Sequence, residues 1–279
     1  MKRLRLAVCI LVIVLLFGAC GKKTEPAPLL EVICLDVGQG NSTLLRTGEG
    51  DVLIDAGPEA AQDALVRRLH ALGVERFALV ILTHPDEDHI GGADGVLREF
   101  PAERVWVNGA AEQNESSLRL DDALLRAGAA PEAVGAGDAV RLGEAVLTVL
   151  FPLRGQAEAG NEGSLVLKLH CGAFSMLVMG DAGGETEEWL LEHYDPVQLR
   201  ASLLHVGHHG SNGSSGADFL RAVVPECAVI SCGAANSYGH PDGRTLARLE
   251  AEGITVRRTD LEGEIRISAD GGGYAFAKE

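Results

Sequence analysis

Basic residues are scarce in this chain. It has 24 lysines and arginines against 40 aspartates and glutamates over 279 residues, a formal net charge of −16. A protein that grips nucleic acid over a long stretch needs many Lys and Arg contacts with phosphates, so the composition disfavours a protein that wraps DNA tightly. Cations bound in an active site could still recruit a phosphate at one point.

The chain also lacks a CxxC pair, which argues against a paired-thiol motif. Two of its six cysteines, Cys9 and Cys20, lie close to the N-terminus. The other four are Cys34, Cys171, Cys227 and Cys232. Most of these lie in or beside apolar runs, where a free thiol packs as a small hydrophobic group. We expect buried thiols, and a Cys34–Cys171 disulfide is the alternative in an extracytoplasmic protein.

The N-terminal apolar run is too short to be a typical transmembrane helix. It extends from Leu6 to Phe17, whereas a spanning helix needs roughly 20 apolar residues. The segment MKRLRLAVCILVIVLLFGAC has a basic start, an apolar run and small residues before a cysteine, which is the pattern of a secretory signal. An uncleaved anchor and an ordinary signal peptide are the competing interpretations.

The end of this segment, LFGAC, resembles the lipobox of bacterial lipoproteins, with Phe17 where Leu is commoner. We therefore expect residues 1–19 to be a lipoprotein signal peptide and Cys20 to be lipidated. Residues 20–29 are polar and carry prolines in GKKTEPAP, as suits a tether. The N-terminus thus predicts an extracytoplasmic protein that a lipid anchors to the bacterial membrane.

Residues 30–279 are predicted to form one globular domain of the α/β class. Short apolar strands separated by turn residues open it, at LLEVICLDV, STLLRT and DVLIDAG. A helix is expected over residues 59–72 from the spacing of its apolar positions, and strands and helices then alternate. A second run of strands begins at AVRL, and alternation returns from residue 185. There are thus two runs of strands, and each is followed by alternating strands and helices. This order predicts two sheets packed face to face with helices outside, a four-layer αββα sandwich.

Acids and histidines concentrate where the buried strand FALVIL ends. The segment LTHPDEDHIGG places His84, Asp86, Asp88 and His89 within six positions. Imidazole and carboxylate together suit Zn, Mn or Fe, and four such groups exceed what one ion takes from one loop. Two adjacent metals therefore fit better. The alternative is an Asp-rich helix N-terminus, where Asp caps exposed N–H groups.

Further acid and histidine turns favour the metal interpretation, because they too follow apolar strands. They contain Asp55, Asp181, His205, His208, His209 and His240.

Several segments between about residues 32 and 241 resemble one family in their order. They are LDVGQGNSTLL, LIDAG, LTHPDEDHIGG, NEGSLVLKL, LVMGD, LLHVGHHGS and SCGAANSYGHP. Together they resemble the metallo-β-lactamase fold family and, within it, the hydrolase domain of the ComEC/Rec2 competence proteins. The many transmembrane segments of a full competence channel are not part of this sequence, so channel function is not implied.

The resemblance implies two divalent metal ions, Zn or Mn, and a set of ligands. His84 and Asp86 would bind one ion, Asp88 and His89 would bind the other, and Asp181 would bridge both. The chemistry is expected to depend on Asp88, His89 and Asp181.

The last histidine turn should supply a further ligand to the second ion, His208 with His209 the alternate. His205 lies inside a strand and is expected in the core or behind the ligands. Asp55, Asn161 and whichever histidine is not a ligand are expected beside the metal ligands, where such groups orient them.

The sequence departs from the wider family at two positions and from the competence proteins at a third. Asp86 stands where many members carry a histidine, and Asn161 takes the place of the usual third histidine of the first site. Both changes make that site harder and poorer in nitrogen. Asn41 stands where the competence proteins commonly carry an acid, which removes one charge near the site.

The predicted function is that of a secreted, lipid-anchored, metal-dependent hydrolase, a phosphodiesterase or nuclease that uses a metal-bound hydroxide. The glycine turns GQGNS and HHGSNGSS offer N–H groups and hydroxyls to a phosphate oxygen, unless they serve turn geometry alone. Asn41, Ser211 and His240 are the expected substrate-binding residues.

The expected partners are a phosphodiester substrate, with DNA as the candidate, and the membrane through the lipid. We infer no protein partner. One alternative is a hydrolase of a β-lactam, a thioester or a phosphocholine-type ester. The other is a non-catalytic envelope module for DNA uptake.

Overall fold

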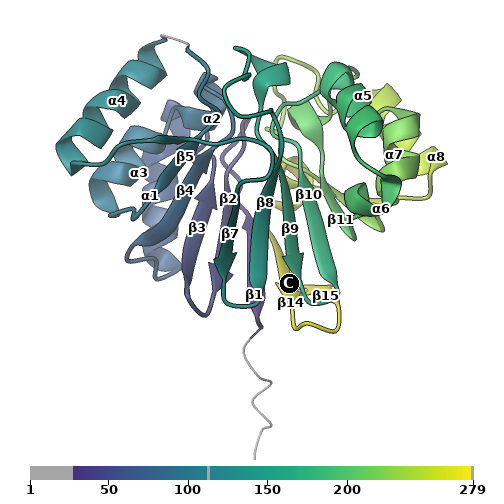
Figure 1. Ribbon diagram of the computed structural model, residues 1–279, viewed down its shortest axis with the longest axis horizontal. Helices are drawn as coiled ribbons and strands as arrows, with labels where there is room; N and C mark the ends of the chain where they lie inside the picture. The colour runs from purple at the N-terminus through teal and green to yellow at the C-terminus, as the bar shows by residue number, and fades with distance from the viewer. Residues whose placement is uncertain (1–27, 112–113, 278–279) are drawn as a thin grey trace, which may run out of the picture.

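The computed structural model describes residues 28–111 and 114–277, so the expected signal peptide and Cys20 lie outside the described residues. Two β-sheets pack face to face, and helices cover both outer faces (Figure 1). This is the four-layer α/β sandwich that the alternation of strands and helices predicts. Among the described helices, none combines the length and the apolar composition that crossing a bilayer requires.

The first sheet contains eight strands. In spatial order they are β15 (Tyr274–Phe276), β14 (Ile265–Ala269), β1 (Leu30–Cys34), β2 (Thr43–Thr47), β3 (Gly50–Ile54), β4 (Phe77–Leu82), β5 (Val105–Val107) and β6 (Glu132–Ala133). Strands β1 to β3 form the expected antiparallel meander, and β3 to β6 are parallel. The penultimate strand β14 returns to pair with β1, which the order of elements along the sequence does not indicate.

The second sheet contains seven strands. In spatial order they are β13 (Thr255–Arg258), β12 (Cys227–Ile230), β11 (Leu203–His205), β10 (Phe174–Val178), β9 (Val166–Cys171), β8 (Ala145–Phe151) and β7 (Ala139–Leu142). Strands β7 to β10 are antiparallel, and β10 to β13 are parallel.

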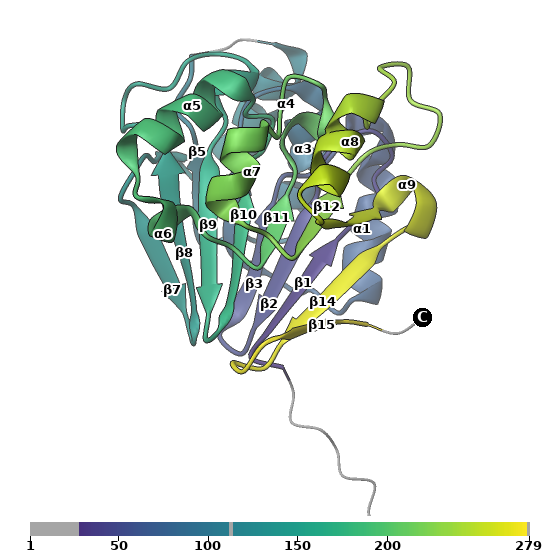
Figure 2. The same ribbon diagram turned by 90° about the vertical axis from the view of Figure 1, so that its right-hand side faces the viewer.

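Helices cover the outer face of each sheet because parallel strands need long crossover connections. On the first sheet lie α1 (Gln62–Ala71), α3 (Ala93–Glu99) and α4 (Glu115–Ala127), and on the second lie α5 (Gly184–His193), α6 (Pro196–Leu199), α7 (Ala217–Val223) and α8 (Gly243–Ala251), as Figures 1 and 2 show. Shorter helices are α2 (Glu87–Ile90) and α9 (Thr259–Glu262), with single turns η1 (Glu59–Ala61), η2 (Asn161–Gly163) and η3 (Gly207–Gly210).

The central strands, such as β1, β4 and β10, are buried on both faces. In β1, Leu30 and Val32 pack into the core between the sheets, whereas Ile33 packs into the core under α1 and α3. Alternate residues of a strand point to opposite faces, so a strand between two cores needs apolar residues at every position. This explains why FALVIL and its counterparts read as unbroken apolar runs.

The described cysteines are free thiols. Cys34, Cys171, Cys227 and Cys232 are all buried and unpaired with one another, so the expectation of buried thiols is confirmed. Burial raises the pKa of Cys34 to about 12. A thiol that stays protonated and inaccessible is chemically inert.

Candidate metal centre

Loops from both sheets meet at one edge of the sandwich, the upper edge in Figure 1. Asp55 directly follows β3, and His84 closely follows β4. Asp181 comes after β10, and His209 lies in η3 after β11. Neighbouring parallel strands end at the same edge, and in open α/β sheets this edge collects binding residues. The fold therefore brings together acids and histidines that are far apart in sequence.

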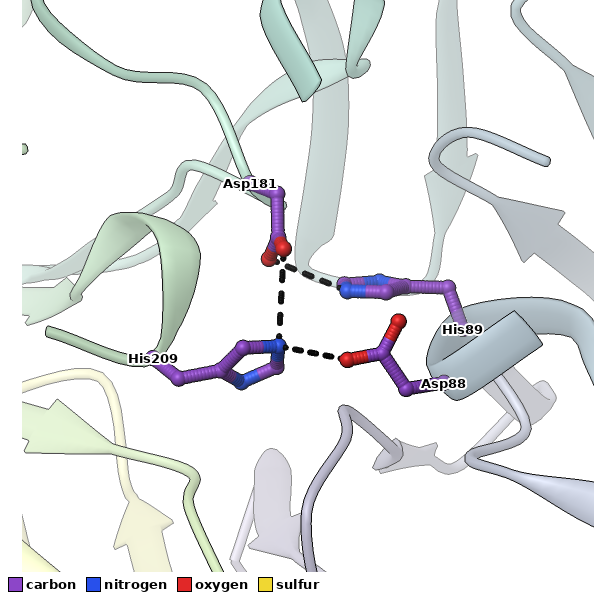
Figure 3. Close-up of side chains that lie close together, drawn as sticks. All are labelled: Asp88, His89, Asp181 and His209. Carbon is purple, nitrogen blue, oxygen red and sulfur yellow. Dashed lines mark hydrogen bonds and ion pairs between the residues drawn. The ribbon is translucent and has the colours of Figure 1, made fainter. Parts of the chain in front are cut away.

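Four side chains converge at this edge, Asp88, His89, Asp181 and His209 (Figure 3). Each offers one ligand atom, and these atoms all lie within 4.8 Å of one another. Asp181 is central. One of its oxygens lies 3.0 Å from His89 Nε2, and the other lies 3.4 Å from His209 Nε2. Two carboxylates and two imidazoles at this spacing match the donor set of a Zn or Mn site.

Asp55 fixes the orientation of His89 from behind. His89 Nδ1 lies 2.8 Å from Asp55 Oδ2, and Thr83 donates to the same carboxylate through its N–H and its hydroxyl. With Nδ1–H donated to Asp55, His89 Nε2 faces the cluster, and a neutral ring would present its lone pair there. A carboxylate behind a metal-binding histidine is a recurring arrangement that sets the tautomer and the ring orientation. This placement agrees with the orienting role that the resemblance implies for Asp55.

Replacing Asp55 should weaken metal binding. We expect Asp55→Asn to lower divalent-ion affinity about 10- to 100-fold, the usual cost of losing such a partner, because the amide no longer fixes the Nδ1–H tautomer. Calorimetric titration of metal-free protein with Mn²⁺ measures this. Asp51→Asn is the matched control, since Asp51 lies at the other end of β3 and pairs with Arg46. Equal affinity in Asp55→Asn and wild type would contradict the assigned role.

A backbone carbonyl orients His209 in the same way. Its Nδ1 lies 2.9 Å from the Ser231 carbonyl oxygen, so Nδ1–H donates there and Nε2 faces the cluster. That Nε2 lies 3.1 Å from Asp88 Oδ2. Both histidines of the cluster are thus held with Nε2 facing carboxylates. Nε2 and carboxylate could together bind a cation, and without a cation they could share a proton.

Burial and charge pairing act in opposite directions on the pKa values of the cluster. Burial opposes charge on His209, but Asp181 and Asp88 outweigh burial and raise its pKa to about 9. Burial likewise opposes charge on Asp181, yet His89 and His209 hold its pKa well below the usual range. Without a metal the cluster therefore retains protons on its histidines. A divalent cation would have to displace them, which links metal affinity to pH.

Unsatisfied atoms at the site support a cation. His84 Nε2 is buried and makes no hydrogen bond, and the Asp86 carboxylate lies 3.5 Å away. His89 Nε2 and Asp181 Oδ1 are also buried and have only each other, at 3.0 Å. Buried polar atoms are nearly always partnered, so ligand atoms as poorly satisfied as these call for a further partner such as an ion. The residues present therefore fit a metal ion.

His84 and Asp86 form a second potential ligand pair beside the cluster. His84 Nε2 lies 3.5 Å from Asp86 Oδ2, and the His84 ring lies 4.1 Å from the His89 ring between centroids. Asp86 occupies the N-cap of α2, yet its side chain accepts no capping hydrogen bond. The helix-capping alternative for this acid is therefore not what the structure shows, and its carboxylate is free for a ligand.

His208 lies at the rim rather than inside the cluster. Its Nε2 is 3.9 Å from Asp181 Oδ2 and 3.2 Å from the Asn161 side-chain nitrogen, and its side chain is 32 % exposed against 2 % for His209. Both histidines adopt left-handed backbone conformations, with φ of 49° and 50°. Such strain in non-glycine residues is concentrated at functional sites. The structure thus brings His209, the alternate in the sequence interpretation, into the four-residue cluster.

The other expected substrate residues are dispersed. His240 lines the same pocket of about 220 Å³ as Asp181 and His208. Ser211 does not appear among the residues of that pocket, and its hydroxyl accepts from the Gly213 N–H. His205 is buried and contacts Ser231 through Nε2, as expected for a residue behind the ligands.

Asn41 is buried behind the ligand loop. Neither polar atom of its side chain has a partner, and its N–H donates to the Asp88 carbonyl at 3.1 Å. The preceding Gly40, with φ of 144°, leaves no room for a Cβ, which would lie 2.4 Å from that same carbonyl oxygen. The GQGN turn therefore packs directly against the backbone of a metal-ligand candidate.

Two residues of the pocket were missed by sequence reasoning. Gln39 and Tyr238 line it together with the acids and histidines. Gln39 belongs to the glycine turn that drew attention for its backbone alone, and Tyr238 directly precedes the GHP segment. In the sequence, only their position next to motif residues could have indicated that they line the pocket.

Comparison with known proteins agrees with this site. Residues 35–234 match the model of the metallo-β-lactamase superfamily, so the chain belongs to that superfamily and is a hydrolase of its fold. A metallo hydrolase from the archaeon Ignicoccus hospitalis has the same fold, with a TM-score of 0.55 and 15 % identity over 85 % of this chain and 98 % of that one.

Its curated relatives include competence proteins. The chain is 36 % identical to competence protein ComA of Neisseria gonorrhoeae, over 94 % of this chain and 36 % of the relative. It is 32 % identical to ComE operon protein 3 of Bacillus subtilis, over 85 % of this chain and 32 % of the relative. The chain thus spans about a third of the length of these relatives. The resemblance to competence proteins is confirmed.

Proposed function

We propose that the protein is a metal-dependent phosphodiesterase with two divalent ions, Mn or Zn, at the edge of the sandwich. Asp88, His89, Asp181 and His209 would hold one ion. His84 and Asp86 would hold the other, with Asp181 between them. Ions at such a site lower the pKa of a water molecule, which supplies the nucleophile, and neutralise charge that develops on the phosphoryl group.

The observation that carries the proposal is the charge layout of the pocket. It is lined by the carboxylates of Asp86, Asp88 and Asp181, which repel an anion unless cations neutralise them. These oxygen ligands suit Mn as well as Zn. A phosphate bound here would depend on the ions rather than on distant charge.

The pocket wall supplies further N–H donors. Asn161, His208 and His240 line the pocket, and burial together with the neighbouring His208 lowers the pKa of His240, which favours the neutral His240 ring. N–H groups there could donate to phosphate oxygens as charge builds on them. Competence proteins among the relatives make DNA the candidate polymer.

A substrate panel tests the proposal. Protein loaded with Mn²⁺ or Zn²⁺ should cleave bis-p-nitrophenyl phosphate and single-stranded DNA, and Asp181→Asn purified identically should not, which controls for contaminating nuclease. Efficient cleavage of nitrocefin or a thioester with every phosphodiester untouched would assign the protein to the β-lactam or ester branch. Bound metal without turnover of any substrate would favour the non-catalytic module.

We also propose that a lipid on Cys20 holds the protein at the extracytoplasmic membrane surface. The lipobox-like LFGAC supports this. Cys20→Ala should release the protein from membrane fractions or block its maturation, and Cys9→Ala is the matched control within the same N-terminal segment. Immunoblots of fractions washed with carbonate measure it. Retention of Cys20→Ala in the washed membranes would instead indicate an uncleaved helix.

A further inference from the structure

One aromatic side chain is exposed at the mouth of the metal centre. The chain has few aromatics, with 2 Trp, 3 Tyr and 7 Phe. Among the residues that the structure describes, Tyr238 is the only aromatic among the largely exposed apolar side chains, at 70 %. A single exposed apolar side chain is common on protein surfaces, so the case for Tyr238 rests on where its ring lies.

Tyr238 lies at the junction of two connected hollows. It lines the pocket over the metal centre, of about 220 Å³, and also a neighbouring hollow of about 640 Å³ that extends toward Pro58. Gln39, Asp86 and Asp88 line both as well, so the two hollows adjoin, and together we call them the cleft. A substrate held at the metal centre would therefore extend past the Tyr238 ring.

Three rings lead from the metal cluster to the surface. The His209 and His240 rings lie 6.4 Å apart between centroids with planes 27° apart, and the His240 and Tyr238 rings lie 5.8 Å apart with planes 25° apart. One side of Tyr238 is therefore backed by His240, while most of the ring faces solvent. Nearly parallel planes are the geometry on which a further flat group can stack.

The loop that carries Tyr238 is held by its own side chains. Asn236 Oδ1 accepts from the N–H groups of Tyr238 and His240, and Asn236 Nδ2 donates to the Gly233 carbonyl oxygen. The loop follows β12 and projects at the edge of the sandwich in Figure 2. The ring is thus presented by an ordered turn, which reduces the entropy lost on binding.

The described residues that line the larger hollow offer no positive charge for the flanking parts of a nucleic acid, and Glu87 adds a carboxylate there. In the described part of the chain, no lysine or arginine lines either hollow. Contacts beyond the scissile phosphate must then come from uncharged groups, and a nucleobase is the part of a nucleotide that an aromatic ring recognises.

We infer that Tyr238 is a stacking platform for an unpaired nucleobase next to the phosphate at the metal centre, an inference that rests on the proposed phosphodiesterase function. Tyr238 is a positioning and specificity-determining residue in this account. Because a base must leave a duplex to stack on the ring, single-stranded substrates are preferred.

Two ligands that differ by the base test the inference. Calorimetry on Mn²⁺-loaded protein compares thymidine 5′-monophosphate with 2-deoxyribose 5-phosphate. The wild type should bind the nucleotide about 10- to 100-fold more tightly, as one base–aromatic stack provides. Tyr238→Ala should abolish that difference while leaving sugar-phosphate affinity unchanged, and Tyr238→Phe and Tyr238→Trp should preserve it. The comparison forms a cycle that isolates the contact between ring and base.

The control variant is Leu261→Ala, because Leu261 is equally exposed, at 71 %, but lines neither hollow. A base preference that survives in Tyr238→Ala, or a variant that loses affinity for both ligands equally, overturns the inference. Turnover of bis-p-nitrophenyl phosphate by the same preparation separates the two claims. Turnover with a base preference independent of Tyr238 refutes the inference alone, whereas protein that cleaves no phosphodiester refutes the proposed function and the inference with it.

Discussion

Asp181→Asn should lower kcat for phosphodiester cleavage at least about 10³-fold. Asp181 is 3 % exposed and faces His89 with one oxygen and His209 with the other, so its loss would leave the proposed centre without its central carboxylate. Metal ions contribute several kcal/mol of transition-state stabilisation, and each ~1.4 kcal/mol is a factor of ten in rate. Steady-state kinetics with bis-p-nitrophenyl phosphate at saturating Mn²⁺ measure the effect.

Elemental analysis of the same preparation should show that Asp181→Asn has lost bound metal. Asp218→Asn serves as the control, since Asp218 is an exposed acid of α7 paired with Arg221. An Asp181→Asn variant that retains both wild-type metal content and wild-type kcat would remove Asp181 from the centre.

The second large effect is a difference between the variants of the two adjacent histidines. His209→Ala should lower kcat about 10³-fold and reduce bound metal, because it removes a buried ligand of the cluster. His208→Ala should keep the metal and lose roughly 10²-fold, the cost of one donor to a developing anion.

Parallel kinetics and metal analysis on these two variants decide the assignment. His70→Ala controls for a general effect of losing an imidazole, because His70 is half exposed and pairs with Glu99. If His208→Ala loses the metal while His209→Ala retains it, the ligand is the one that the family resemblance first suggested.

Much of the sandwich follows from local patterns. Unbroken apolar runs such as FALVIL mark strands buried on both faces, and the apolar spacing after residue 59 gives the turn and helix that continue to Ala71. The return of β14 to β1 cannot be read in this way. Strand partnership over more than two hundred residues depends on tertiary packing, and nothing in the sequence of β14 itself specifies which sheet edge it joins.

The site, like the fold, could be predicted from local patterns only in part. Acids and histidines at strand ends predict where ligands gather, since the topology brings strand ends together. The choice between His208 and His209 is different, because consecutive left-handed backbone conformations determine which ring turns inward. Tyr238 was missed for a related reason: its significance lies in its exposure and its cleft, and neither has a pattern in one sequence.

The most direct test of the central claim is a titration of metal-free protein with Mn²⁺ that follows phosphodiester cleavage and bound metal together. We predict that cleavage of bis-p-nitrophenyl phosphate rises with occupancy and reaches its maximum when two ions are bound per chain. Full occupancy without any phosphodiester cleavage, or cleavage that persists undiminished in protein stripped of metal, would contradict the account.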